Sequence, residues 1–250
     1  MGNVHVGTAL GEAAEAFPSG FANDRARCFV TVPATTLPGG ITVPAFRVAR
    51  WLAARGPGGV VLLSDTARPW VNIAYHAARA ACFRSGLGLL TELQALAIAH
   101  DLARQAINWS GGAGRLFQGL HLGGFGGPQP ASVASTDPRE RRWHELSNGQ
   151  RIHDFAGNAF SWVFDDVQGD PHGVVAHVFA ADSPTVSGAP GLPLDQGLGW
   201  WPKAGSNWYG RALARGSSWS SGEGAGMFTV IDERPRSERP YIGFRCTLPA

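Results

Sequence analysis

The chain has 250 residues, and 44% of them are hydrophobic, which is enough apolar material for one large domain or two small ones. Charged residues make up 16% and the formal net charge is +2, a balance that argues against nucleic acid or an anionic membrane as a partner. The 34 glycines and 17 prolines stay below the level typical of disordered low-complexity chains. Composition therefore indicates a globular protein rich in loops.

Targeting and cysteine patterns give a second set of exclusions. No stretch approaches 18 consecutive apolar residues, so we expect no membrane span, and residues 1–16 lack the features of a secretory signal. The cysteines, Cys28, Cys82 and Cys246, are few and widely spaced. This favours buried thiols in a reducing compartment over a disulfide framework or a zinc site, with one bridge left open.

The first third of the chain predicts short strands followed by two helices. Prolines interrupt residues 1–45, and residues 28–32 and 60–63 are short β-rich runs. Alanines recur at helical spacing over residues 72–83. Thr91 and Gln94 have the spacing of a capping box, in which each side chain bonds the other residue's backbone N–H, and this predicts a helix from residue 91 to about 106.

From residue 110 onward, Gly, Pro, Ser and Trp dominate the chain. We expect short strands separated by long ordered loops, which in compact domains tend to be functional. The expected strands are residues 160–164, 173–179, 212–219 and 242–246.

Most catalytic templates are missing from the sequence. There is no GxSxG or HExxH pattern, and the glycines at 222–226 lack the lysine of a phosphate loop, so we expect no catalytic residue and no cofactor. A Ca²⁺ site is left open only if a loop gathers the acidic and histidine side chains of this region; otherwise they cap turns. These side chains are His153, Asp154, Asp165, Asp166, Asp170 and His172.

Residues typical of binding surfaces gather between Trp208 and Tyr241. Aromatic side chains provide large contact areas at low entropic cost, and serine and glycine adapt to a partner. A polar loop around a buried tryptophan would have the same composition, so composition alone leaves both interpretations open.

Four stretches follow one another in chain order: residues 69–73, 87–97 and 153–163, and Arg-Gly-Ser-Ser-Trp at 215–219 with Gly-Phe-Arg-Cys at 243–246. Together they resemble the formylglycine-generating-enzyme branch of the C-type-lectin-like fold. The resemblance implies an α+β fold with a small twisted antiparallel sheet, two helices and extensive ordered loops. It implies a domain at 44–250, preceded by a strand and turn segment at 1–43.

The chain departs from the enzymes of that branch at their chemistry. Their catalytic cysteines follow the Gly-Gly-Ser-Trp element, whereas residues 205–245 contain no cysteine here and Ser220 and Ser221 follow Trp219. Ser161 stands where the family has a glutamate before tryptophan. Because a hydroxyl cannot replace a thiolate in copper-dependent oxidation, we do not expect oxidase activity, although a formylglycine-generating-enzyme-like oxidase is the first alternative.

Residues 215–246 resemble more closely the variable region of diversity-generating retroelement proteins. The resemblance implies that a retroelement rewrites adenine-bearing codons in a region of about 205–246, and that a lectin-like scaffold displays the altered side chains without catalysis. Its scaffold positions would be Trp219, Gly222, Ala225, Gly226, Phe228, Gly243, Phe244 and Arg245. The displayed set expected here is Trp208, Tyr209, Ser218, Ser220, Ser221, Glu223, Ile231, Glu233, Arg234, Glu238, Pro240 and Tyr241.

The partner implied is a protein or surface ligand whose identity the sequence cannot name. Self-association or an anchoring partner is left open, and the expected location is cytoplasmic or phage- or prophage-encoded. A phage or cell-surface receptor-binding subunit with one fixed ligand is the second alternative.

Overall fold

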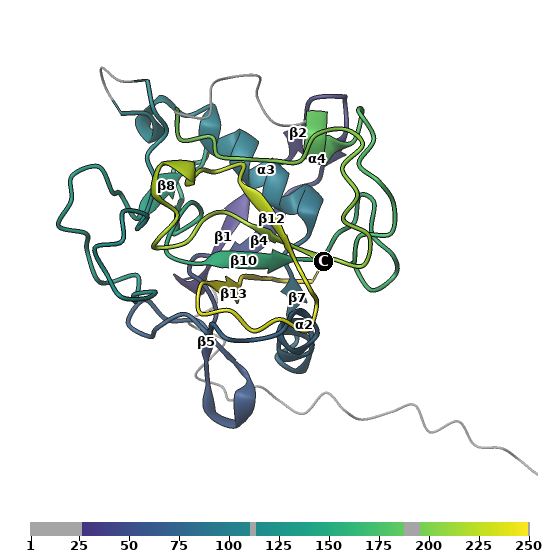
Figure 1. Cartoon of the computed structure of the whole chain (residues 1–250). Helices are drawn as coiled ribbons and strands as arrows, with labels where there is room; N and C mark the ends of the chain where they lie inside the picture. Colours follow the sequence, from purple (N-terminus) through teal and green to yellow (C-terminus); the bar gives the residue numbers. More distant parts are fainter. Residues whose placement is uncertain (1–26, 111–113, 188–195, 250) are drawn as a thin grey trace, which may run out of the picture.

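The computed structural model describes residues 27–110, 114–187 and 196–249, and two four-stranded sheets lie at its centre (Figure 1). The first sheet has the order β1 (Phe29–Val32), β4 (Phe46–Ala49), β14 (Cys246–Thr247) and β7 (Gly88–Leu89). The second has the order β12 (Val230–Glu233), β11 (Ala212–Arg215), β10 (Phe160–Val163) and β13 (Ile242–Phe244). Neighbours are antiparallel except β10 and β13, which are parallel.

Smaller elements surround the two sheets. The two-stranded pairs are β2 (Thr35–Thr36) with β3 (Thr42–Val43), β5 (Ala54–Arg55) with β6 (Val61–Leu62), and β8 (Trp143–Glu145) with β9 (Arg151–His153). The helices are α2 (Tyr75–Arg84), α3 (Glu92–Ala103) and α4 (Pro184–Ser187), with 3-10 turns η1 (Pro57–Gly59), η2 (Ala106–Asn108) and η4 (Gly222–Gly224). The predicted α+β class is confirmed, with few helices and small, mainly antiparallel sheets.

Both predicted helices form, and their starts have local causes. The Thr91 hydroxyl accepts the Gln94 backbone N–H at 3.2 Å, and the Gln94 side chain accepts the Thr91 N–H at 3.0 Å, so the capping box is confirmed. Helix α2 begins at Tyr75 rather than 72 because Asn72 has a φ of 52°, outside the helical region. The short helix α4 was not predicted.

The strand predictions after residue 110 are partly wrong. Strands β10, β11 and β13 lie inside predicted ranges, but residues 173–179 form bends and irregular chain. Gly173 has a φ of 75°, and the ladder contact of Val175 is an isolated bridge with Gly169. Strand β12 and the β8–β9 hairpin were missed.

The domain boundary expected between residues 43 and 44 falls inside the first sheet. Strand β1 precedes it, strand β4 follows it, and the two pair antiparallel from Phe29↔Ala49 to Val32↔Phe46. Val30 also belongs to the apolar core that contains the buried face of α3. Residues 27–43 are therefore part of the same unit, and residues 1–26 lie outside the described residues.

Two apolar clusters form the core, one around α3 and one around α2. In the second, Trp162 of β10 is fully buried, and its indole Nε1 donates to the Ile73 carbonyl at 2.9 Å. Its ring meets Tyr75 edge-on at 6.0 Å between centroids. None of the helices in the described residues has the length and hydropathy needed to cross a bilayer.

The β8–β9 hairpin carries a buried histidine that predicts acid sensitivity. His144 is fully buried; its Nε2 lies 2.8 Å from the Phe117 carbonyl oxygen, and its Nδ1 has no hydrogen-bond partner. Burial lowers the pKa of His144 to about 4. The unfolded chain, with a histidine pKa near 6.5, therefore binds a proton at a pH where the folded chain does not.

We expect His144→Gln to make unfolding less dependent on pH between about 6.5 and 4. In the wild type the free energy of unfolding should fall with falling pH in this window, by up to about 1.4 kcal/mol per pH unit from this residue. Glutamine removes the titrating group but keeps an N–H donor for Phe117. Urea unfolding at several pH values measures the two slopes, and equal slopes would contradict the assignment.

Candidate ligand-binding surface

Residues 215–245 form most of the region of about 205–246 that is expected to carry the binding surface. This stretch starts at a buried ion pair. Arg215, the last residue of β11, donates from Nε to Oε2 of Glu92 at 2.8 Å and from Nη2 to Oε1 of the same carboxylate. Its Nη1 donates to the Phe228 carbonyl at 2.7 Å, and the Thr185 hydroxyl donates to Glu92 at 2.7 Å. Arg215 thus connects β11 to α3 and to the turn that precedes β12, and Thr185 of α4 bonds the same carboxylate.

The turn after β11 depends on small residues. Gly216 has a φ of 89°, and a Cβ at this position would lie 2.7 Å from the Phe155 carbonyl oxygen, so a side chain is excluded both by conformation and by contact. The Ser217 hydroxyl is buried and accepts the Gly226 N–H at 2.7 Å, which closes the base of the loop. Ser218 is only 4% exposed, and its hydroxyl lies 3.0 Å from that of Ser221. Ser218 therefore stabilises the turn and does not face solvent as expected.

The loop from 218 to 224 lies against residues 115–123. Main-chain bonds join Trp219 N to Asn158 O at 3.0 Å, Gly123 N to Trp219 O at 2.9 Å and Gly222 N to His121 O at 2.8 Å. Trp219, an expected scaffold position, is only half-buried, and its indole Nε1 has no hydrogen-bond partner. Its main-chain bonds, rather than its ring, hold the loop.

The sequence Asp-x-x-Gly-Asn at residues 154–158 supports this loop. Asp154 and Asn158 have φ values of 53° and 68°. The Asp154 carboxylate accepts from Nε of Arg142 at 2.7 Å and from Nδ2 of Asn158 at 3.0 Å. The Asn158 amide also pairs with both main-chain groups of Gln129, at 2.8 and 2.9 Å. The motif is therefore a structural junction that joins residues 129 and 142 to the loop.

Two of the acidic residues weighed as Ca²⁺ ligands, Asp165 and Asp170, cap turns. Asp165 accepts the N–H groups of Val167 and Gln168, and Asp170 accepts those of His172 and Val174. Burial raises the pKa of Asp165 to about 6. Within the described ranges, no three His, Cys, Asp or Glu residues gather as they would around a metal ion.

The return from β12 to β13 is held by main-chain bonds to the start of α2. Tyr75 N donates to Pro235 O at 3.0 Å, and Asn72 N donates to Arg239 O at 2.9 Å. Arg239 also donates from Nε to the Glu233 carboxylate at 2.7 Å. These contacts set the path of residues 234–241 without using the side chains of Arg234, Glu238 or Pro240.

The segment ends at a second buried cation. Arg245 is fully buried, with Nη1 2.7 Å from the Ala49 carbonyl and Nη2 donating to the carbonyls of His153 and Asp154. Burial lowers its pKa to about 10, so it stays charged at neutral pH. Both ends of the segment are thus anchored by buried arginines.

Ten of the twelve predicted display residues lie between these anchors, and Trp208 and Tyr209 precede them. Eleven of the twelve lie at least partly at the surface, Ser218 being the exception. The exposed ones are Tyr209, Ser220, Glu223, Arg234, Glu238 and Pro240. The half-buried ones are Trp208, Ser221, Ile231, Glu233 and Tyr241. Figure 1 shows that the loop of η4 and the return at 234–241 extend from opposite ends of β12, so the predicted residues form separate groups rather than one patch.

An aromatic cluster lies where the loop around Phe179 runs beside the loop around Trp208. Trp208 stacks on Trp200 with centroids 5.8 Å apart and meets Phe179 edge-on at 5.0 Å. Tyr209 is 73% exposed, Val178 54% and Trp200 47%. Phe179 is itself buried in the core at 1% exposure and Trp208 packs against that core, so the cluster connects the core to exposed apolar side chains. Sequence reasoning selected Trp208 and Tyr209 but missed Val178 and Trp200; the crowding of tryptophans after residue 199 was the available signal for Trp200.

No family model and no curated protein sequence matches this chain. Three solved structures are similar to it in chain path. Treponema denticola variable protein 1 has a TM-score of 0.49 at 13% identity, covering 88% of this chain and 93% of its own. PvdO from Pseudomonas aeruginosa has 0.44 at 15%, covering 88% and 90%. The Major Tropism Determinant P3c variant has 0.36 at 14%, covering 88% and 54%.

The cysteines lie away from the surface just described. Cys28, Cys82 and Cys246 are all buried, and Ser220 and Ser221 occupy the loop after Trp219. The loop after Trp219 therefore carries hydroxyl and carboxylate side chains and no thiol.

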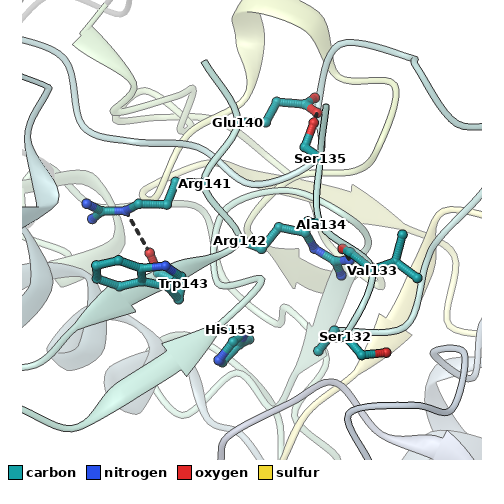
Figure 2. A pocket seen from close by; sticks show the side chains of 10 residues that line it. Ser132, Val133, Ala134, Ser135, Glu140, Arg141, Arg142, Trp143 and His153 are labelled. Carbon is teal, nitrogen blue, oxygen red and sulfur yellow. Dashed lines mark hydrogen bonds between the residues drawn. The ribbon is translucent and has the colours of Figure 1, made fainter. Parts of the chain in front are cut away.

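A separate hollow of about 240 Å³ lies beside the β8–β9 hairpin (Figure 2). Figure 2 shows Arg141 on its wall, donating from Nε to the Trp143 carbonyl at 3.1 Å. Arg142 is engaged by Asp154 and by the carbonyls of residues 129, 130 and 133. His153 has an unpartnered Nδ1, and burial lowers its pKa. The charged groups that line the hollow bond to other parts of the chain, and none of the predicted display residues lines it. We therefore assign the hollow to the structural junction around Asp154 and Asn158.

Proposed function

We propose that this chain is a ligand-binding display protein with a C-type-lectin-like scaffold, that a retroelement diversifies its surface within about 205–246, and that it performs no catalysis. One observation carries the proposal. The path of residues 216–243 is set by buried anchors and main-chain hydrogen bonds, while most of the predicted side chains end at the surface.

The backbone path must stay constant for the fold, whereas the exposed side chains can change. The bonds from Gly222 N to His121 O, from Val230 N to Trp200 O and from Phe160 N to Tyr241 O use only backbone atoms. A substitution at an exposed side chain leaves them in place. Many different surfaces can therefore be presented on one backbone.

The ligand we propose is a protein or another surface structure rather than a small substrate. Trp200 and Tyr209 are exposed and Trp208 is half-buried, and such aromatic side chains provide contact area at low entropic cost. The exposed polar groups at Ser220, Glu223 and Arg234 adapt to a partner. We further propose a phage- or cell-surface setting, in which self-association or an anchoring partner positions the chain.

We expect the fold to tolerate simultaneous alanine substitution of Ser220, Glu223, Arg234 and Glu238. Surface changes away from special features have small effects, so Tm should move by no more than about 3 °C. The matched control is the single substitution Gly226→Ala, whose Cβ would overlap the backbone of Gly199 and which should lower Tm by more than the four changes together. Thermal unfolding followed by circular dichroism measures both.

Binding is tested with a library randomised at the six exposed positions of the predicted set. Panning against an unrelated protein such as lysozyme should enrich folded binders, and reverting their selected positions should abolish binding. A library whose members fold but contain no binder above background would overturn the binding role.

Diversification is tested separately by sequencing the DNA next to the gene. We expect a near-copy of the codons for residues 205–245 that differs at adenines, beside a reverse-transcriptase reading frame. Absence of both would overturn diversification and favour a receptor-binding subunit with one fixed ligand.

A further inference from the structure

Two cysteines far apart in sequence meet in the core at the end of the proposed display segment, residues 205–246. Cys82 lies in α2 and Cys246 in β14, and their Sγ atoms are 3.2 Å apart. Both side chains are almost completely buried, at 1% and 0% exposure. The third cysteine, Cys28, donates to the Leu63 carbonyl at 3.7 Å.

The surroundings of this pair are apolar. Both residues belong to the cluster that contains Trp162 and Phe244. Burial and the adjacent Cys82 raise the pKa of the Cys246 thiol well above its usual value. Because thiolates are the species that exchange, a bond between these sulfurs must form before the core closes, and once formed it is protected from reductants.

We propose that Cys82 and Cys246 form a disulfide bond during folding. The oxidant is a small-molecule or protein disulfide. One cysteine thiolate attacks it to give a mixed disulfide and releases one thiol; the second cysteine thiolate then attacks the mixed disulfide and releases the other. Two electrons pass to the oxidant, which leaves as two thiols, and two cysteine thiols become one disulfide.

The bond has a clear structural consequence. Strand β14 has two residues and is held by short pairings, Thr247↔Val48 with β4 and two pairs with β7. A bridge from Cys246 to α2 fixes the end of the display segment covalently. It also closes a loop of more than 160 residues in the unfolded chain, which favours the folded state. This inference rests on the buried pair alone and is independent of the proposed function.

The test refolds the full chain in a mixture of oxidised and reduced glutathione. Unfolding in iodoacetamide without reductant, followed by digestion and mass spectrometry, should find a peptide that links Cys82 to Cys246, with Cys28 alkylated. The intact mass should be lower by two hydrogen atoms. Compared with wild type refolded under a phosphine reductant, the oxidised protein should melt roughly 5–15 °C higher.

Cys28→Ser is the matched control, because it removes a thiol from the same core and should retain the bridge, whereas Cys82→Ser should lose it. The decisive measurement uses the wild-type chain, so it does not depend on whether a variant folds. Alkylation of all three cysteines after oxidative refolding, or a bridge that includes Cys28, would overturn the proposal.

Discussion

Replacing Arg215 with methionine is expected to lower the free energy of unfolding by about 3–5 kcal/mol. The substitution leaves the Glu92 carboxylate in the core with the Thr185 hydroxyl as its remaining side-chain donor among the described residues, and it also removes the donor to the Phe228 carbonyl. An uncompensated buried charge costs far more than the pair contributes over apolar replacements. Chemical denaturation at neutral pH measures the loss.

A double variant and a surface control make this result specific. Glu92→Met combined with Arg215→Met removes both charges and should be more stable than Arg215→Met alone, because no buried charge is left unpaired. Arg139→Met breaks an exposed pair, in which Nη2 lies 2.6 Å from Asp137, and should not measurably change stability. A double variant no more stable than Arg215→Met would contradict the buried-charge explanation.

Replacing Trp162 with alanine is expected to cost about 3–5 kcal/mol of unfolding free energy. The ring fills the core cluster around α2, and the change leaves a cavity and an unpaired Ile73 carbonyl. Trp162→Phe should cost less because it keeps most of the apolar volume. Urea unfolding monitored by circular dichroism separates the three proteins.

The matched surface change is Tyr209→Ala. Its side chain is 73% exposed, so the change should alter stability by less than about 0.5 kcal/mol. If Tyr209→Ala were as destabilising as Trp162→Ala, the aromatic cluster would be part of the core, and its assignment to a binding surface would be wrong.

Together, these two predictions distinguish residues that stabilise the fold from residues that we propose contact a ligand. Arg215 and Trp162 lie on neighbouring strands, β11 and β10, which pair from Ser161↔Arg215 to Val163↔Leu213. Their loss should disturb the base from which the display segment extends. Loss of the exposed side chains should leave this base intact and affect only recognition.

Features controlled by local bonding were predictable from the sequence. The capping box at Thr91 and Gln94 needs only residues three apart, and it forms as predicted. The tight turn at Gly157 and Asn158 has positive φ at both residues, as their types indicate. Gly216 was expected to permit a close approach of the backbone, and Phe155 makes it.

Features decided by distant partners were not predictable. Strand β12 lacks a clear alternation and is followed by Pro235; it is a strand because Ala212–Arg215 pairs with it. The range 173–179 was predicted as a strand but forms bends and irregular chain, with Gly173 at a φ of 75° and a single isolated bridge between Gly169 and Val175.

The candidate surface shows the same division. Composition and motif order predict a binding segment near the C-terminus, because residue types suited to recognition can be counted along a sequence. Only the folded chain decides that Ser218 faces inward, that Trp219 is half-buried, and that Trp200 stacks on Trp208. Local conformation follows from short-range bonding between sequence neighbours, whereas burial and proximity depend on contacts between segments far apart in the chain.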